Sequence, residues 1–365
     1  MDPNTPQCYP VPNMRKSVFV ALFFSAALSA LGQAAAPPQA LPKDPREILA
    51  MAAPYYNFND PALKPWHLKA TYQLYDDQGK PAEQGTFEYW WASPKVRRSS
   101  WTRPSMKHTD WYTADGRHAY EASGDGLSYY ENKLESELFS PLPESRDLDP
   151  AAVKLVSDEL HVNDVKLSCT MAVPIKLTIW KGETASLGIF PTYCFGPSLP
   201  VLRLKYSIGN LAVNFNSIVE VQGCFLARKV DFHQGKQHVL TADVVTVEGM
   251  SPTDPALAPT VSAIMPTTEK VPVGAGLAVG MLVKKQMPLY PLDAKNAGAS
   301  GTVVLQATIG RDGRIRDLRV VSAPWPSLAA AALMAVSEWQ YRPYMLNGEP
   351  VEVETTINVI FKLGP

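Results

Sequence analysis

The sequence has almost no net charge. Across 365 residues, 34 lysines and arginines stand against 35 aspartates and glutamates, which gives a formal net charge of −1. A protein that attracts nucleic acid or an anionic membrane through its overall field needs a clear basic surplus. We therefore expect no nucleic-acid partner. The length favours two or more domains, and the hydrophobic content of 46% is sufficient for packed cores.

The sequence motifs of catalysis and metal binding are also missing. The chain has no Gly-x-Ser-x-Gly, no His-Glu-x-x-His, no phosphate-binding loop and no Cys-x-x-Cys. Its six histidines are scattered, and the nearest pair, His233 and His238, falls on opposite faces of an expected strand. Gly274, Gly276 and Gly280 lack the spacing of a dinucleotide-binding loop. We expect a protein that is not an enzyme and has no catalytic residue, metal site or cofactor.

Only one long hydrophobic run is present, from about Val18 to Leu31, and Arg15 and Lys16 precede it. A basic start, an apolar centre and a following small-residue zone are typical of a secretory signal peptide. The alternative is a single membrane anchor, but a spanning helix needs about 20 apolar residues. We expect residues 1–36 to be a cleaved signal peptide, with Met14 as an alternative start, and the mature protein to be exported and soluble.

The chain has few cysteines, at positions 8, 169, 194 and 224. Cys8 precedes the apolar run and would be removed with the signal peptide. An oxidising compartment favours a disulfide among the remaining three. We predict a disulfide between Cys169 and Cys194, with Cys224 buried and unpaired. A Cys194–Cys224 bond is the alternative.

Residues 44–248 have the pattern of an antiparallel β protein, because short alternating segments are separated by turn residues at regular intervals. The expected fold is mainly β and antiparallel, as a meander, half-barrel or sandwich. Short helices are expected at 45–53, 134–138 and 150–160. The expected strands are 66–74, 85–91, 95–102, 107–113, 118–121, 165–172, 176–180, 201–208, 211–219, 223–232 and 237–247.

Large aromatic side chains are concentrated in the first of these strands. One interpretation is a hydrophobic core, since aromatic residues are common in strands and bury much area. The other is an apolar cavity for a lipid. The order of strand, glycine turn, aromatic strand, basic strand and Asp-Gly hairpin resembles the LolA-like half-barrel carriers of bacterial lipoproteins. That resemblance implies a lipid or other hydrophobic ligand for the N-terminal domain. The aromatic residues are Trp66, Tyr72, Phe87, Tyr89, Trp91, Trp101, Trp111 and Tyr120.

A proline-rich segment, residues 249–275, follows and is expected to be an extended, semi-rigid linker. Residues 276–365 then have the pattern of a small α+β domain of the order β-β-α-β. Alternation predicts strands at 301–309, 315–322 and 351–361. In the last strand Val353, Ile357, Val359 and Phe361 are expected to face the core, and Glu352, Glu354, Thr356 and Asn358 to face away from it. The apolar stripe of 328–341 predicts a helix ending before Pro343, with Trp339 as its buried anchor.

The C-terminal pattern resembles the C-terminal domain of TonB-family proteins over about residues 281–363. Each matching segment, or word, is a weak signal of the family alone, but the order of the five along the chain is a specific one. The words are Tyr290-Pro291, Gly301-Thr302-Val303 with Asp312-Gly313, Ala331-Ala332-Leu333 with Ala335-Val336, Trp339-Gln340-Tyr341-Arg342-Pro343, and Asn347-Gly348-Glu349-Pro350-Val351.

The resemblance implies a periplasmic protein whose exposed sheet edge pairs with a peptide of an outer-membrane transporter or another envelope protein, by strand addition. A homodimer through the same edge strand is an open alternative. The alternative is that the polar face of this strand only prevents edge pairing. The chain departs from the energy-transducing members, because it has no long spacer rich in proline, lysine and glutamate. The expected peptide-binding edge residues are Val351, Glu352, Val353, Glu354, Thr355, Thr356 and Ile357.

Overall fold

The computed structural model describes residues 41–76, 78–151, 153–162, 164–174, 190–197, 200–207, 211–265, 270–275 and 280–363. The expected signal peptide and the expected strand at 176–180 lie outside these residues. Within them, two large hydrophobic cores are present, one built from residues up to Val247 and one from residues between Val271 and Phe361. A third, small cluster surrounds Cys169 and Cys194.

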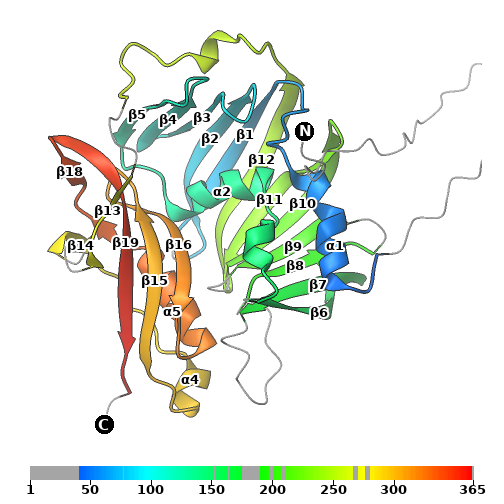
Figure 1. Cartoon of the computed structure of the whole chain (residues 1–365), viewed down its shortest axis with the longest axis vertical. Coiled ribbons are helices and arrows are strands. Elements are labelled where there is room, and N and C mark those ends of the chain that lie inside the picture. Colours follow the sequence, from blue (N-terminus) through cyan, green and yellow to red (C-terminus); the bar gives the residue numbers. More distant parts are fainter. Residues whose placement is uncertain are drawn as a thin grey trace, which may run out of the picture.

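The N-terminal unit is a single antiparallel sheet of twelve strands in the order β5-β4-β3-β2-β1-β12-β11-β10-β9-β8-β7-β6. Figure 1 shows this sheet curving around helix α2 (Tyr129–Phe139). The expectation of a mainly β, antiparallel domain is confirmed. The strands are β1 (Trp66–Tyr75), β2 (Pro81–Trp91), β3 (Arg97–Arg103), β4 (Met106–Tyr112), β5 (His118–Gly124), β6 (Val153–Val162), β7 (Val165–Pro174), β8 (Thr192–Phe195), β9 (Leu202–Ser207), β10 (Leu211–Val221), β11 (Cys224–Gln234) and β12 (Gln237–Gly249).

Helix α2 is fixed to the sheet by a buried carboxylate. Ser128 and Glu131 form a capping box at its start, which satisfies two backbone donors of the first turn. Glu131 is fully buried, and its Oε1 accepts from Tyr72 Oη at 2.6 Å and from Arg103 Nε at 3.0 Å. Because a buried carboxylate needs such partners, α2 has one position against the sheet. The shorter helices are α1 (Pro45–Ala52), η1 (Ala53–Tyr56), η2 (Ser145–Leu148) and η4 (Pro255–Leu257).

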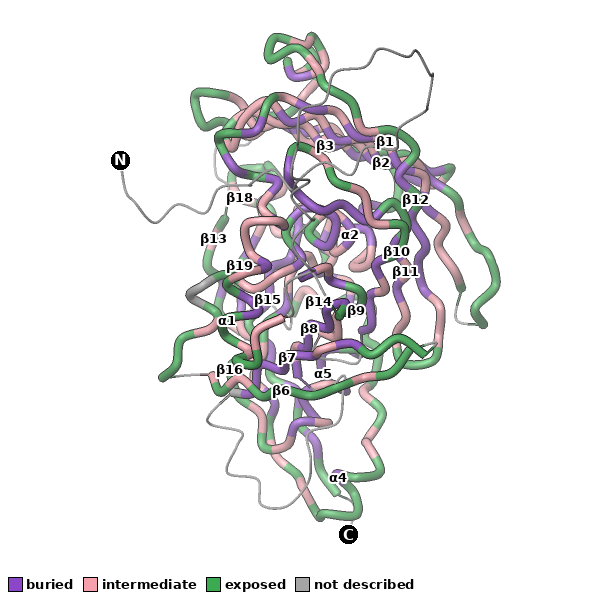
Figure 2. Tube along the Cα trace, turned by 90° about the vertical axis from the view of Figure 1, so that its right-hand side faces the viewer, coloured by how far each residue is buried: buried purple, intermediate pink, exposed green. Residues whose placement is uncertain are grey.

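The aromatic residues of the first strands fill the space under α2. Phe139 of this helix contacts the rings of Trp66, Phe87 and Tyr89 at centroid distances between 4.6 and 6.2 Å. All eight aromatic residues singled out in the sequence are buried. Six of them, all except Trp111 and Tyr120, belong to the N-terminal core cluster, which supports the core interpretation. Figure 2 shows buried positions, in purple, along these strands.

One expected helix is wrong. Residues 150–160 were predicted to be helical, whereas the chain forms β6 at Val153–Val162, which pairs with β7 from Val153↔Pro174 to Val162↔Val165. Asp158 and Glu159 favour a helix only weakly, and pairing along a whole hairpin outweighs that local preference.

The C-terminal unit is a small α+β domain that contains the expected order β-β-α-β, as β15 (Gly301–Ile309), β16 (Ile315–Ser322), α5 (Pro326–Ser337) and β19 (Glu349–Phe361), within a sheet of five strands. β15 lies between β16 and β19, and α5 packs on this sheet. The remaining elements are β13 (Lys270–Pro272), β14 (Leu282–Lys284), α4 (Leu292–Asn296), β17 (Gln340–Tyr341) and β18 (Tyr344–Leu346).

Helix α5 ends earlier than predicted. Its last residue is Ser337, and Gln340–Tyr341 instead form β17, which pairs with β14. The reason is Trp339, whose ring turns into the core and whose Nε1 donates to the Gln286 carbonyl at 2.8 Å. The prediction that Trp339 is a buried anchor is confirmed, since only 6% of it is exposed.

The segment between the two cores is attached to both of them, and its conformation is extended at each point of attachment. Ile264 and Tyr120 exchange backbone hydrogen bonds of 2.9 Å, so this segment covers the edge strand β5. Farther along, β13 joins the C-terminal sheet beside β19. Edge strands provide free donors and acceptors, and a passing proline-rich segment uses them in both places.

Candidate functional site

The outer edge of β19 is the first candidate site. On one side β19 pairs with β15 from Val353↔Ile309 to Phe361↔Gly301. On the other side β13 pairs with residues 352–354, and β18 pairs with residues 349–351 at the start of the strand. From 355 to 361, no strand in the described part of the chain pairs with that side. β19 therefore forms the outer margin of the sheet (Figure 1, red) with half of its length open.

The register of β13 shows which backbone groups face the open side. The Val273 amide donates to the Glu354 carbonyl at 2.8 Å, so the backbone of Glu354 points outward. Successive residues of a strand direct their backbone groups to opposite sides. Thr356, Asn358 and Ile360 therefore present their amides and carbonyls to the open edge, and the intervening residues bond to β15.

The side chains of β19 alternate between the core and the outer face of the sheet. Thr355, Ile357, Val359 and Phe361 are buried in the core, whereas Asn358 is exposed and Ile360 is 61% exposed. The alternation predicted from the sequence is thus correct. A strand added here would bond to the backbone of β19 and contact side chains on the outer face of the sheet only.

The N-terminal part of the expected binding edge is already occupied by other strands of this protein. Lys270 of β13 places its Nζ 3.3 Å from Glu352 and 3.5 Å from Glu354. Burial alone would lower the pKa of Lys270, but the two carboxylates raise it above its usual value. Of the residues predicted to bind a peptide, Val351 to Glu354 are therefore already paired. Thr355, Thr356 and Ile357 begin the open stretch.

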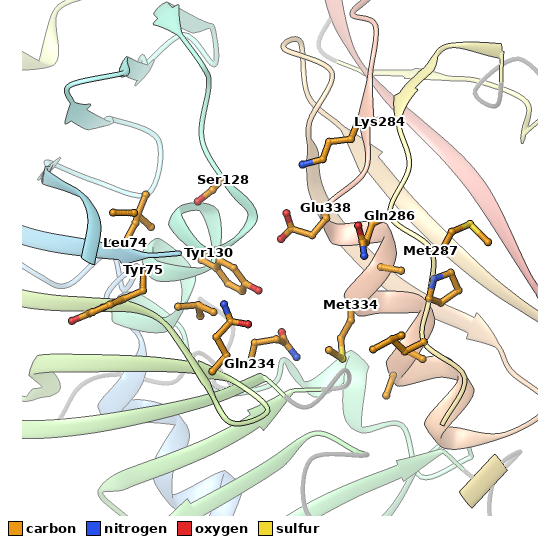
Figure 3. A pocket seen from close by; sticks show the side chains of 18 of the residues that line it. Leu74, Tyr75, Ser128, Tyr130, Gln234, Lys284, Gln286, Met287, Met334 and Glu338 are labelled. Carbon is orange, nitrogen blue, oxygen red and sulfur yellow. The ribbon is translucent and has the colours of Figure 1, made fainter. Parts of the chain in front are cut away.

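A second candidate site is a cleft of about 920 Å³ between the two units (Figure 3). Leu74, Tyr75 and Tyr130 of the N-terminal unit form one wall. Met334 of α5 and the segment from Gln286 to Leu289 form the other wall. The residues of this cleft come from distant parts of the sequence, and no local pattern identified them.

A third, more polar cavity of about 600 Å³ lies on the other side of the contact between the units. Asp110 accepts hydrogen bonds from Nε2 of His108 at 2.6 Å and Nε2 of His118 at 2.7 Å. Burial would raise the pKa of Asp110, but the two imidazoles hold it well below its usual range. Glu135 lines the same cavity, and burial, followed by the charge of Asp110, raises its pKa to about 7.

Polar contacts across this cavity fasten the two units together. The Arg311 guanidinium lies 4.8 Å above the ring of Tyr120. Arg316 donates to the side chain of Asn132 at 3.2 Å, and Lys133 lies 3.3 Å from Asp317. In the described part of the chain no group of three or more histidine, cysteine or acidic side chains has the geometry of a metal site.

The predicted disulfide is present. Cys169 of β7 and Cys194 of β8 are directly paired in register and are disulfide-bonded. The expectation that Cys224 is unpaired is wrong, because the described part of the chain contains no free thiol. That expectation rested on the removal of Cys8 with the signal peptide. Among the described helices, none has the length and apolar character needed to cross a membrane.

Comparison with known proteins identifies relatives of the C-terminal unit. Residues 286–363 match the family described as the C-terminal domain of the Gram-negative bacterial TonB protein. Protein TonB of Vibrio cholerae serotype O1 is 33% identical over 84 residues, which are 22% of this chain and 34% of that protein. The chain therefore matches about a third of the length of this relative.

Several solved structures are similar to parts of the chain. A LolA superfamily protein from Nitrosomonas europaea covers 59% of this chain and 97% of its own, at 8% identity and a TM-score of 0.36. A DUF1329 family protein from Desulfovibrio piger covers 54% and 92%, at 12% identity and 0.33. The solution structure of the Pseudomonas aeruginosa TonB C-terminal domain covers 23% and 86%, at 26% identity and 0.19. The family match over residues 286–363 confirms the resemblance of the C-terminal unit to the C-terminal domain of TonB.

Proposed function

We propose that this protein is a periplasmic adaptor that binds an extended peptide of an outer-membrane transporter, or of another envelope protein, along β19. The observation that carries the proposal is the open edge from 355 to 361, where three residues direct their backbone groups outward. Strand addition to such an edge derives its affinity from main-chain hydrogen bonds. The TonB-type sequence of the same unit supports this role.

The proposal includes export by the N-terminal segment and a binding function without catalysis. Glu135, with its pKa near 7, has a value suited to proton transfer. Its partners, however, are structural: Asp110 is held by two histidines, and the neighbouring contacts join the two units. Perturbed pKa values occur in such ion-pair networks as well as in active sites.

The test is a titration of the full chain with fluorescently labelled peptides from the periplasmic segments of outer-membrane transporters. Asn358→Pro removes one outward amide and leaves the bonds to β15 intact. We expect it to weaken binding about tenfold or more. Asn358→Ala keeps the amide and should bind within about threefold of the wild type, because main-chain bonds carry the affinity.

A second variant tests the part of the edge occupied by β13. Lys270→Glu places a negative charge beside Glu352 and Glu354, which should release β13 and lengthen the open edge. Peptide binding should become tighter.

Unchanged peptide binding by Asn358→Pro, with the melting temperature preserved, would contradict strand addition at this edge. A proline at position 355 would not test the open edge, because the Thr355 amide faces β15 and not the open side.

A further inference from the structure

Helix α5 has an unusual composition for a helix at the surface of a unit. From Pro326 to Ser337 it contains no charged residue. Its inner face, which includes Leu328 and Val336, is buried on the sheet. Its outer face presents Ala330 and Met334 to the cleft between the units (Figure 3). A surface helix normally carries charged residues on its outer face, so this face is suited to an apolar neighbour.

Beside α5, apolar side chains are held in the cleft by a fixed backbone. Leu289 lines the cleft and is 85% exposed, and Met287 is 65% exposed. Their segment is anchored at one end by the bond from Trp339 to the Gln286 carbonyl. At the other end, the hydroxyl of Tyr290 donates to the Ala299 carbonyl. The exposure of the two side chains therefore does not result from a frayed end.

The opposite wall completes a concave, two-sided site. Leu74, Tyr130 and Val239 of the N-terminal unit line it, and Leu74 and Tyr130 also pack against the N-terminal core. A volume of about 920 Å³ lies at the upper end of the usual range of ligand pockets, roughly 300–1,000 Å³. A concave site of this size encloses a slender ligand, whereas a folded partner would contact only its rim.

The charged side chains that line the cleft indicate where the polar end of a ligand would lie. Lys284 is the one cation among the lining residues that the structure describes, and it is exposed. Figure 3 shows it at one end of the wall, with Met287 and Met334 farther in. Two acidic residues also line the cleft. Glu83 is paired with Arg103 at 2.6 Å, and Glu338 lies at the same end of the wall as Lys284 (Figure 3). Lys284 and Glu338 thus place charges of both signs at the rim, with apolar side chains farther in.

We propose that this cleft binds the acyl chain of an amphiphile, with the polar head group at the rim near Lys284 and Glu338. The chain would lie between the outer face of α5 and the wall formed by Leu74, Tyr130 and Val239. Methionine side chains adapt to the shape of such a chain. This inference does not depend on peptide binding at β19, because the cleft and the open edge share no residue.

The test uses the full chain and a fluorescent fatty acid, cis-parinaric acid, at a fixed ionic strength. We expect saturable binding with one site per chain. Leu289→Glu and Met334→Glu place charges in the apolar interior and should each weaken binding about tenfold or more. Lys284→Glu should weaken the binding of the fatty acid and should affect the binding of a neutral monoacylglycerol less. Val321→Glu is the matched control, since Val321 is exposed outside the cleft.

Several results would overturn the proposal. They are the absence of saturable binding, equal binding by Leu289→Glu and the wild type, or loss of binding in the Val321→Glu control. A dimer in sedimentation that Leu289→Glu converts to monomer would show that a second copy occupies the cleft instead. Melting temperatures near the wild-type value confirm that the variants are folded. Peptide titrations of the same variants should be unchanged, which separates this test from that of the edge.

Discussion

At the scale of single residues, Trp339 decides the stability of the C-terminal unit. Its ring is buried in the core, and its Nε1 bonds to the segment that leads to the cleft. Trp339→Ala should lower the free energy of unfolding of this unit by about 3–5 kcal/mol, the usual cost of removing a large buried aromatic side chain. Trp339→Phe should cost less, because it loses mainly one hydrogen bond. Urea denaturation followed by circular dichroism measures both, and an unchanged midpoint for Trp339→Ala would refute the assignment.

Glu135 makes the stability dependent on pH. Its pKa in the folded protein is about 7, above the ordinary value, so between about pH 4.5 and 7 the folded state binds more protons than the unfolded state. The stability should therefore fall as the pH rises from 5 to 8. Glu135→Gln should reduce this fall by roughly 1–3 kcal/mol, at about 1.4 kcal/mol per pKa unit.

Urea denaturation at pH 5 and pH 8 tests this effect. Glu220→Gln, at an exposed position of β10, is the control and should keep the pH dependence of the wild type. An equal fall in the wild type and Glu135→Gln would show that other groups cause it. The sequence indicated neither Glu135 nor its partners, because its pKa arises from burial beside Asp110, which lies on another element.

At the scale of elements, the disulfide joins two neighbouring strands. Cys169 and Cys194 lie 25 residues apart in sequence and opposite each other in β7 and β8. The bond restricts the unfolded chain, so replacing both cysteines by serine should destabilise the N-terminal unit by about 2–4 kcal/mol. Denaturation of the double variant measures this, and a midpoint equal to that of the wild type would contradict a structural role. The C-terminal unit should be unaffected.

The elements predicted well are those whose sequence pattern is local and strong. β19 alternates over thirteen residues, and its buried and exposed faces are as predicted. The helix expected at the position of β6 was wrong, and the pairing partners of the linker were not predicted, for one reason: both depend on strands that are distant in the sequence. β6 pairs with β7, and the segment 249–275 pairs with β5 and β19. Periodicity within a segment carries no information about such partners.

At the scale of the whole molecule, the two units meet through polar contacts, and both cavities border this contact. The walls of the cleft come from β1, α2 and the β11–β12 hairpin on one side and from α5 on the other. No stretch of sequence contains both walls, so the cleft could not be predicted. The open edge of β19 could be predicted, because it belongs to one strand.

These polar contacts should control how firmly the two units are held together. Arg311, Arg316 and Lys133 each contact a partner across the interface. Partly exposed contacts contribute roughly 0–1 kcal/mol each, so a single substitution should have little effect. Replacing all three by alanine should separate the units. We expect a larger radius of gyration in small-angle X-ray scattering, most clearly at high salt, which screens the remaining charges.

The same variant links the arrangement of the units to the two proposed sites. The cleft needs both walls, so the triple variant should lose fatty-acid binding, whereas peptide binding along β19 should persist because this edge lies within one unit. Arg117→Ala is the control, since Arg117 is exposed and pairs with Asp115 inside the N-terminal unit. If the triple variant kept the wild-type radius of gyration, the polar contacts would not hold the units together. If it also kept its fatty-acid affinity while its radius increased, the ligand would bind to one wall alone.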